Sequence, residues 1–313
     1  MDAVRGEAGQ AALEWVGLVA LVAMVLTAGL VGAGKAPEVG DAGRAVADAF
    51  LCAAGVEDRC GAEGIEGMYG EEVAALVRRH APTIRYQSGS ASMPVDYRHC
   101  LGTPSCAWGR KEGQVGRSHD GLPATAFTHV VDRRQRGGSL YLQYWLYYPE
   151  SLTGGSGVPG VRKLMEGTRA FHLHDWESYQ VRIGPDGKAE SRAGSHHGHQ
   201  YARTRNPWSA DRHRGWGPST GGVDVSGGSH AGAAKPEPRV ERWVAGAAEE
   251  VAWGPLLPAA LRRKRNREPR TTPARELQLL PIEPLADADR SFGSVTPPWR
   301  KRVYRDPEAP GTS

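Results

Sequence analysis

The sequence predicts a mainly β fold with peripheral helices and long loops, preceded by one N-terminal transmembrane helix. Residues 138–148 are rich in the aromatic and aliphatic side chains typical of strands, and residues 178–183 alternate polar and apolar side chains. The 41 glycines and 22 prolines, beside only four phenylalanines, indicate many loops around a modest core. Residues 15–34 contain no charge and could cross a bilayer as a helix.

The N-terminal segment is expected to hold the chain in a membrane. At about 1.5 Å per residue, residues 15–34 would span about 30 Å, the thickness of a hydrocarbon core. The preceding leader contains Asp2, Arg5 and Glu7, so it lacks the basic start of an ordinary secretory signal. We therefore expect a transmembrane helix at residues 10–34, with the rest of the chain outside the cytoplasm.

The junction between leader and apolar run reads Gly9-Gln-Ala-Ala-Leu-Glu14. It resembles type IV prepilin signals, particularly those of the Flp/Tad class, in which a peptidase cuts after the glycine and a glutamate lies five residues beyond the cut. The resemblance implies that residues 1–9 are a leader, that Gly9 and Glu14 serve processing and assembly, and that pilus-assembly subunits are partners. A plain signal anchor, in which Glu14 has no such role, is the alternative.

Four cysteines form two local pairs, Cys52/Cys60 and Cys100/Cys106, and neither spacing is the C-x2-C of a typical zinc site. Four cysteines allow three connectivities, of which two short bridges are the simplest. An extracytoplasmic location favours disulfides. Four reduced thiols are the alternative.

The region between anchor and β domain, residues 35–79, is expected to be a linker and helical stalk. An amphipathic helix is predicted at residues 71–80, stopped by Pro82. Residues 124–132 and 138–148 should then form a hairpin. The net charge of +4 is too small to indicate nucleic acid as a partner.

The stretch His172-Leu-His-Asp-Trp-Glu177 concentrates ionisable side chains at the start of a predicted strand. Strand alternation places Asp175 and Glu177 on the same face as Val181, which should be buried. Buried carboxylates need a cation or a hydrogen-bond cluster. His172 has the opposite parity and joins them only if residues 171–174 form a loop. The alternative is a strand start whose polar groups are locally satisfied.

Residues 171–177 match five of the seven positions of the Gly-His-Arg-His-Asp-Trp-Glu signature of NPP1-like necrosis-inducing proteins. Residues 81–86, 140–149, 228–231, 298–299 and 304–307 also resemble segments of that family or of its Vps62-related relatives.

The resemblance implies an antiparallel β-sandwich domain at residues 80–313. It also implies that His172, Asp175 and Glu177 help to hold a divalent cation, with Mg²⁺ or Ca²⁺ suited to oxygen ligands. Where the family has a further acidic ligand this chain has Ser151, with Glu150 beside it.

Further histidines could add to this site. His196 and His197 lie in a histidine-rich segment after the signature strand, and His230 lies in a Gly-Ser-His-Ala segment. A solvated turn is the alternative for the first two, and a backbone-bonded strand-end histidine is the alternative for His230.

Three functional classes follow. The first is a membrane-anchored or pilus-associated protein whose β domain binds a surface glycan or lipid head group, aided by a cation. The second is a metal-dependent or acid–base hydrolase, although the sequence contains no nucleophile elbow and no His-Glu-x-x-His motif. The third is a structural minor pilin. Binding is favoured over catalysis, and the expected location is the cell membrane or, after processing, the pilus or cell surface.

Overall fold

The computed structural model describes residues 64–87, 92–100, 104–109, 113–152, 168, 171–194, 198–202, 212–236, 270–287 and 291–309. The chain divides into two compact units, Met1–Ala62 and Glu63–Ser313, and every described residue belongs to the second. Within the described ranges no helix is long and apolar enough to cross a membrane. The predicted anchor lies outside these ranges, as do several predicted site residues: Gly9, Glu14, Cys52, Cys60, His196 and His197.

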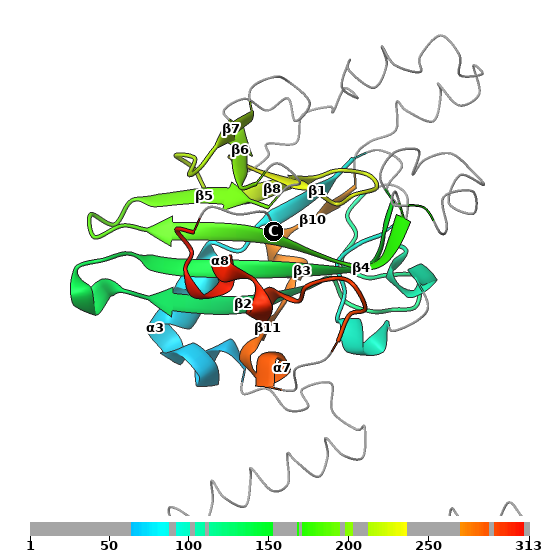
Figure 1. Cartoon of the computed structure of the whole chain (residues 1–313), viewed down its shortest axis with the longest axis horizontal. Helices are drawn as coiled ribbons and strands as arrows, with labels where there is room; N and C mark the ends of the chain where they lie inside the picture. The colour runs from blue at the N-terminus through cyan, green and yellow to red at the C-terminus, as the bar shows by residue number, and fades with distance from the viewer. Residues whose placement is uncertain are drawn as a thin grey trace, which may run out of the picture. The chain divides into compact units, whose positions relative to one another are not determined.

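The second unit is built on one curled sheet of eleven strands (Figure 1). The strands are β1 (Thr83–Tyr86), β2 (Thr125–Asp132), β3 (Leu140–Leu152), β4 (Phe171–Ile183), β5 (Ala189–Ala193), β6 (Gln200–Ala202), β7 (Arg212–Arg214), β8 (Gly221–Val225), β9 (Gly232–Pro236), β10 (Thr271–Thr272) and β11 (Gln278–Pro281). Their order is β10-β1-β8-β9-β6-β5-β4-β3-β2-β11, with β7 paired to β6.

This topology confirms the mainly β prediction but corrects the expected antiparallel sandwich. The strands form a single continuous sheet, and it is mixed: β1 with β8, β6 with β9, and β2 with β11 are parallel pairs. Parallel neighbours come from segments far apart in the sequence, so local strand patterns could not reveal them.

Few helices accompany the sheet. Among the described residues the α-helices are α3 (Ile65–Arg79), α7 (Glu283–Asp287) and α8 (Arg302–Arg305), and the short 3-10 turns are η1 (Tyr97–His99), η2 (Pro104–Ala107), η3 (Arg134–Arg136), η5 (Ala274–Glu276) and η6 (Pro298–Arg300). Gly70 interrupts α3 with a φ of 75°, a conformation that glycine adopts without steric cost. Residues 65–79, assigned to a linker and stalk by the sequence, pack on the sheet: the Tyr144 hydroxyl donates to the Val77 carbonyl at 2.6 Å.

The central hairpin of β3 and β4 positions the candidate site. These 13-residue strands pair from Leu140 opposite Ile183 to Leu152 opposite Phe171. β2 pairs antiparallel to β3 across the turn at η3, which confirms the predicted hairpin. β4 begins at Phe171, so residues 171–174 form a strand and not the loop that His172 would need in order to join the carboxylates. His174 nevertheless has a φ of 63°, which breaks the regular strand geometry there.

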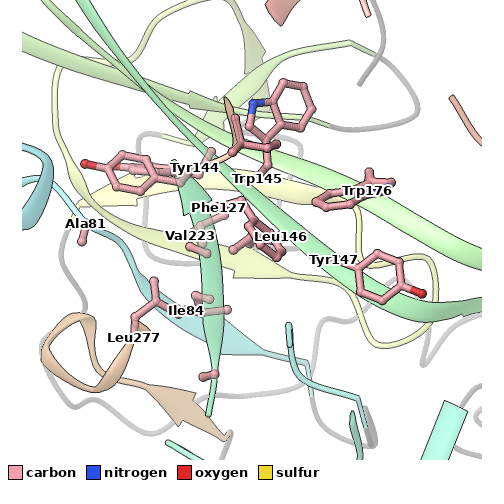
Figure 2. Close-up of a cluster of buried hydrophobic side chains, with 14 of the residues drawn as sticks. Ala81, Ile84, Phe127, Tyr144, Trp145, Leu146, Tyr147, Trp176, Val223 and Leu277 are labelled. Carbon is pink, nitrogen blue, oxygen red and sulfur yellow. The ribbon is translucent and has the colours of Figure 1, made fainter. Parts of the chain in front are cut away.

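Both faces of β3 are buried. On one face Tyr144 and Leu146 pack toward α3 and β1 (Figure 2). On the other face lie Trp145 and Trp176, and the Trp176 ring contacts that of Phe292. The second face is covered by the C-terminal segment, because the Gln143 amide donates to the Val303 carbonyl at 2.9 Å. β3 therefore reads as a nearly continuous apolar and aromatic run rather than as an alternating strand.

One of the two predicted local cysteine bridges is present. Cys100 and Cys106 form a disulfide between η1 and η2, in loops that lie against β3. The bridge closes a short loop beside the end of the sheet that carries the candidate site.

Candidate functional site

Asp175 and Glu177 lie on the face that strand alternation predicted. Asp175 is opposite Tyr148, and Glu177 is opposite Leu146. The same face continues into the buried Val181. Each carboxylate residue is only 8% exposed, so the two negative charges sit at the margin of the core. Two charges held so far from water need compensating partners nearby.

His230 supplies the first partner. Its Nδ1 lies 3.0 Å from Asp175 Oδ2, and as an N–H it donates to that carboxylate. The imidazole stacks on the Tyr148 ring, with 3.9 Å between centroids and 1° between planes. His230 itself has a φ of 52°, a conformation uncommon for a residue with a side chain. Tyr148, Asp175, Glu177 and His230 together form the polar cluster.

The turn between β8 and β9 holds His230 in place. The Leu152 amide donates to the Gly228 carbonyl at 3.0 Å, so the turn is attached to the end of β3. Within the turn, the Ser226 and Ser229 hydroxyls are 2.8 Å apart, and the Ser226 amide donates to the Ala231 carbonyl. His230 therefore faces β4 from a closed turn bonded to the sheet on both sides.

Tyr148 brings an unsatisfied hydroxyl into the cluster. Its side chain is fully buried, and among the residues that the structure describes its hydroxyl has no hydrogen-bond partner. Burial raises the pKa of Tyr148 well above its ordinary value, and the Glu177 and Asp175 carboxylates raise it further. The hydroxyl is therefore protonated and available as a donor. An unpartnered buried hydroxyl costs about 1–3 kcal/mol, which an added ligand atom could recover.

Arg270 and Tyr86 form a cation–aromatic pair, and Tyr148 acts electrostatically on its guanidinium. The Arg270 guanidinium stands over the Tyr86 ring, 4.8 Å from its centroid, and donates to the Ser92 carbonyl at 3.0 Å. Burial lowers the pKa of Arg270, while Tyr86 and Tyr148 act in the opposite direction. Burial also raises the pKa of Tyr86 to about 12, so its hydroxyl remains neutral at physiological pH.

The two signature histidines make local contacts. His172 Nδ1 lies 2.8 Å from the His174 carbonyl oxygen, and His174 Nδ1 lies 2.7 Å from the Tyr147 hydroxyl. On the neighbouring strand β3, Ser151 lies opposite His172 and Glu150 lies opposite Leu173. Within the signature, the two histidines therefore bond to nearby groups, whereas the two carboxylates are buried.

The resemblance implies a cation site at His172, Asp175 and Glu177. Within the described ranges no group of three His, Cys, Asp or Glu side chains could hold a metal ion. Asp175 already binds His230, and Ser151, where an acidic ligand was expected, is buried. Cation binding by His172, Asp175 and Glu177 stays a prediction.

Sequence reasoning missed Tyr148 as a site residue, and it also missed Lys301. Its Nζ donates to the Trp176 carbonyl at 3.2 Å, across a separation of 125 residues. The Glu177 and Asp175 carboxylates both act electrostatically on this ammonium. The sequence placed Trp299 in a family-like C-terminal segment, but a lysine two residues later carried no signal of contact with β4.

Comparison with known proteins adds little. No family model matches the sequence, and no curated protein matches it. A solved structure described as "Toxin fold for microbial attack and plant defense" is similar at 14% sequence identity and a TM-score of 0.39, covering 75% of this chain and 88% of that chain. At that TM-score and identity the likeness carries no argument.

Proposed function

We propose that this chain is an extracytoplasmic protein, anchored in the membrane or associated with a pilus, whose β domain binds a surface glycan or lipid head group. The binding site is the polar cluster of Tyr148, Asp175, Glu177 and His230. The observation that carries the proposal is the fully buried Tyr148 hydroxyl, which has no partner among the described residues. A native structure rarely keeps such a group beside two carboxylates without a reason.

The donor and acceptor set suits a polyhydroxylated ligand. The Asp175 and Glu177 carboxylates accept hydrogen bonds from hydroxyls, and the neutral Tyr148 hydroxyl donates one. A few convergent polar groups beside aromatic rings are typical of small-ligand sites. Leu173, 48% exposed at the start of β4, adds an apolar contact at the nearby strand end.

The location and the pilus association rest on residues 1–34. The uncharged run and the Gly9-to-Glu14 spacing support them, and both lie outside the described residues. A minor pilin with a purely structural β domain is the alternative, and it predicts no ligand binding by the polar cluster.

A second candidate is a hydrolase, favoured by one observation. Asp175 and His230 form a buried hydrogen-bonded pair at 3.0 Å, and a carboxylate that orients an imidazole is a common acid–base arrangement. His230 would take a proton from water, and Asp175 would stabilise the resulting imidazolium.

Binding is tested with the full-length chain in detergent, on an array of soluble glycans and on phosphatidylcholine vesicles with and without glycolipid. We expect binding to at least one class, weakened by Tyr148→Phe and Asp175→Asn but not by the control Asp186→Asn in the exposed β4–β5 turn. Absence of binding to both, or equal binding by all variants, would contradict the proposal. Release of a cleaved glycan or head group that His230→Gln abolishes would support the hydrolase instead.

A further inference from the structure

The buried carboxylate pair requires a positive counter-charge. Asp175 and Glu177 are each 8% exposed, and one histidine could not balance two negative charges there. An uncompensated buried charge is strongly unfavourable, so a cation from the protein or from solution must lie close by. The candidates are a bound divalent ion and a side chain of this chain.

Lys301 has the required position. β5 pairs with β4 only up to Tyr179, and Gly194 donates to the next carbonyl, that of Ser178. Beyond this point Lys301 Nζ donates to the Trp176 carbonyl, where a strand neighbour would otherwise donate. The ammonium also lies 5.5 Å from the centroid of the Trp145 ring.

The electrostatics agree with this position. Burial lowers the pKa of Lys301, and the Glu177 and Asp175 carboxylates oppose that effect by favouring the charged ammonium. Glu177 is the stronger of the two influences. The two carboxylates therefore favour the charged form of this half-buried ammonium.

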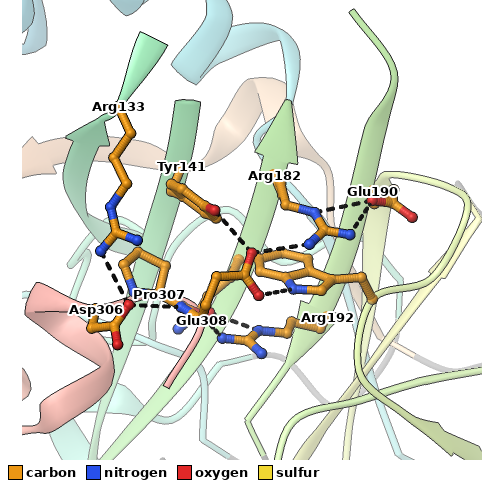
Figure 3. Close-up of polar contacts among 10 residues, drawn as sticks. Arg133, Tyr141, Arg182, Glu190, Arg192, Asp306, Pro307 and Glu308 are labelled. Atoms are coloured by element: carbon orange, nitrogen blue, oxygen red, sulfur yellow. Dashed lines mark hydrogen bonds and ion pairs between the residues drawn. The ribbon is translucent and has the colours of Figure 1, made fainter. Parts of the chain in front are cut away.

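A polar network anchors the segment that carries Lys301 (Figure 3). The Glu308 carboxylate accepts bonds from the Tyr141 hydroxyl at 2.9 Å, from Arg182 at 2.9 Å and from the Trp216 indole at 3.0 Å. Arg133 donates to Asp306 at 3.0 Å. These bonds tie the chain end to β3, β4 and the neighbouring loops, so the position of Lys301 depends on the folded C-terminal segment.

We propose that the Lys301 ammonium is the built-in counter-charge of the Asp175–Glu177 pair, and that a divalent cation binds there only by displacing it. Lys301 thus offsets part of the negative charge of the polar cluster without a metal. It also makes Mg²⁺ or Ca²⁺ weak competitors. The inference does not depend on the ligand proposed above, because it concerns the unliganded protein.

Calcium titration of the full-length chain tests the displacement. Lys301→Met removes the charge and keeps a stem of similar length over Trp145. We expect its apparent Ca²⁺ affinity to exceed that of wild type roughly ten-fold or more. Lys301→Arg should behave as wild type, as should Lys188→Met, which removes a lysine whose side chain is 83% exposed. Adding Asp175→Asn to Lys301→Met should remove the gain. Equal Ca²⁺ affinity in wild type and Lys301→Met, or binding by neither, would overturn the proposal.

A stability cycle tests the charge balance without any metal. Lys301→Met takes the ammonium away from both carboxylates, and Glu177→Gln takes away the carboxylate that favours the ammonium most, whereas both together remove a positive and a negative charge. We expect the double variant to unfold at a higher urea concentration than the sum of the single effects predicts. If Lys301→Met does not fold, recovery of folding in the double variant supports the proposal. Additive effects, or no recovery, would contradict it.

Discussion

The His230 imidazole and the Tyr148 ring lie parallel, 3.9 Å apart, and this stack places one histidine nitrogen against the Asp175 carboxylate. The stack joins the turn between β8 and β9 to the end of β3. It also leaves the Tyr148 hydroxyl beyond the ring without a partner among the described residues. In the polar cluster, His230 therefore has a hydrogen-bond partner, whereas the Tyr148 hydroxyl has none among the described residues.

Two tyrosines on one face of β3 should respond differently to loss of the hydroxyl. Tyr144→Phe breaks a bond to the Val77 carbonyl and should lower the free energy of unfolding by about 1 kcal/mol or more. Tyr148→Phe removes an unpartnered hydroxyl and should change it by less than about 0.5 kcal/mol, or stabilise the protein. Urea unfolding measures both. An equal loss in the two variants would show that the Tyr148 hydroxyl has a partner in the unliganded protein.

Acid should weaken the fold through His80, whose Nδ1 lies 3.2 Å from the Thr220 hydroxyl. Burial, and next the charge of Arg79, lower its pKa below the ordinary 6.5. The unfolded chain therefore binds this proton at a higher pH than the folded chain does. Stability should fall as pH drops through the unfolded value and level off below the folded one.

Urea midpoints at pH about 7.5 and about 5 measure the effect of His80. His80→Gln should reduce the loss at the lower pH, while Lys188→Met should not alter it. An acid loss of the same size in His80→Gln as in wild type would exclude this histidine as a source.

The C-terminal segment should depend on Glu308. Glu308→Ala removes an acceptor of three hydrogen bonds and should lower the free energy of unfolding by about 1 kcal/mol, with a change in the fluorescence of Trp216. Glu72→Ala is the matched control, because its pair with Arg134 is a surface ion pair and should contribute close to zero. Equal effects of the two substitutions would contradict a specific role for the Glu308 network.

The disulfide between Cys100 and Cys106 should stabilise the loops beside β3. Its cysteines are six residues apart, and closing so short a loop contributes about 2 kcal/mol in the chain-entropy description. Replacing both by serine should lower the unfolding midpoint by a corresponding amount. A midpoint unchanged from wild type would show that packing alone orders these loops.

Processing of the N-terminus is testable independently of the β domain. The spacing from Gly9 to Glu14 predicts cleavage after Gly9, which leaves Gln10 as the first residue. N-terminal sequencing of protein extracted from membranes of the native host would establish the cut. An intact Met1, or a first residue beyond position 34, would rule out prepilin-type processing.

Strand alternation alone determined that Asp175 and Glu177 lie on the same face of the strand and that this face is buried. Side-chain direction in a strand depends only on position parity. The hairpin of β2 and β3 and the bridge from Cys100 to Cys106 were likewise predictable, since their partners are close in sequence. The aromatic and aliphatic content of β3 indicated a strand. That both of its faces are buried became clear only from the segments that pack on each face.

Tertiary structure decided which groups meet the carboxylates. His230 contacts Asp175 across 55 residues, and Lys301 reaches Trp176 across 125. Such contacts depend on the order of strands in the sheet and on the path of the C-terminal segment, and both are set by the packing of the whole unit. The single mixed sheet has the same cause, because its parallel pairs join distant segments whose local patterns carry no information about their neighbours.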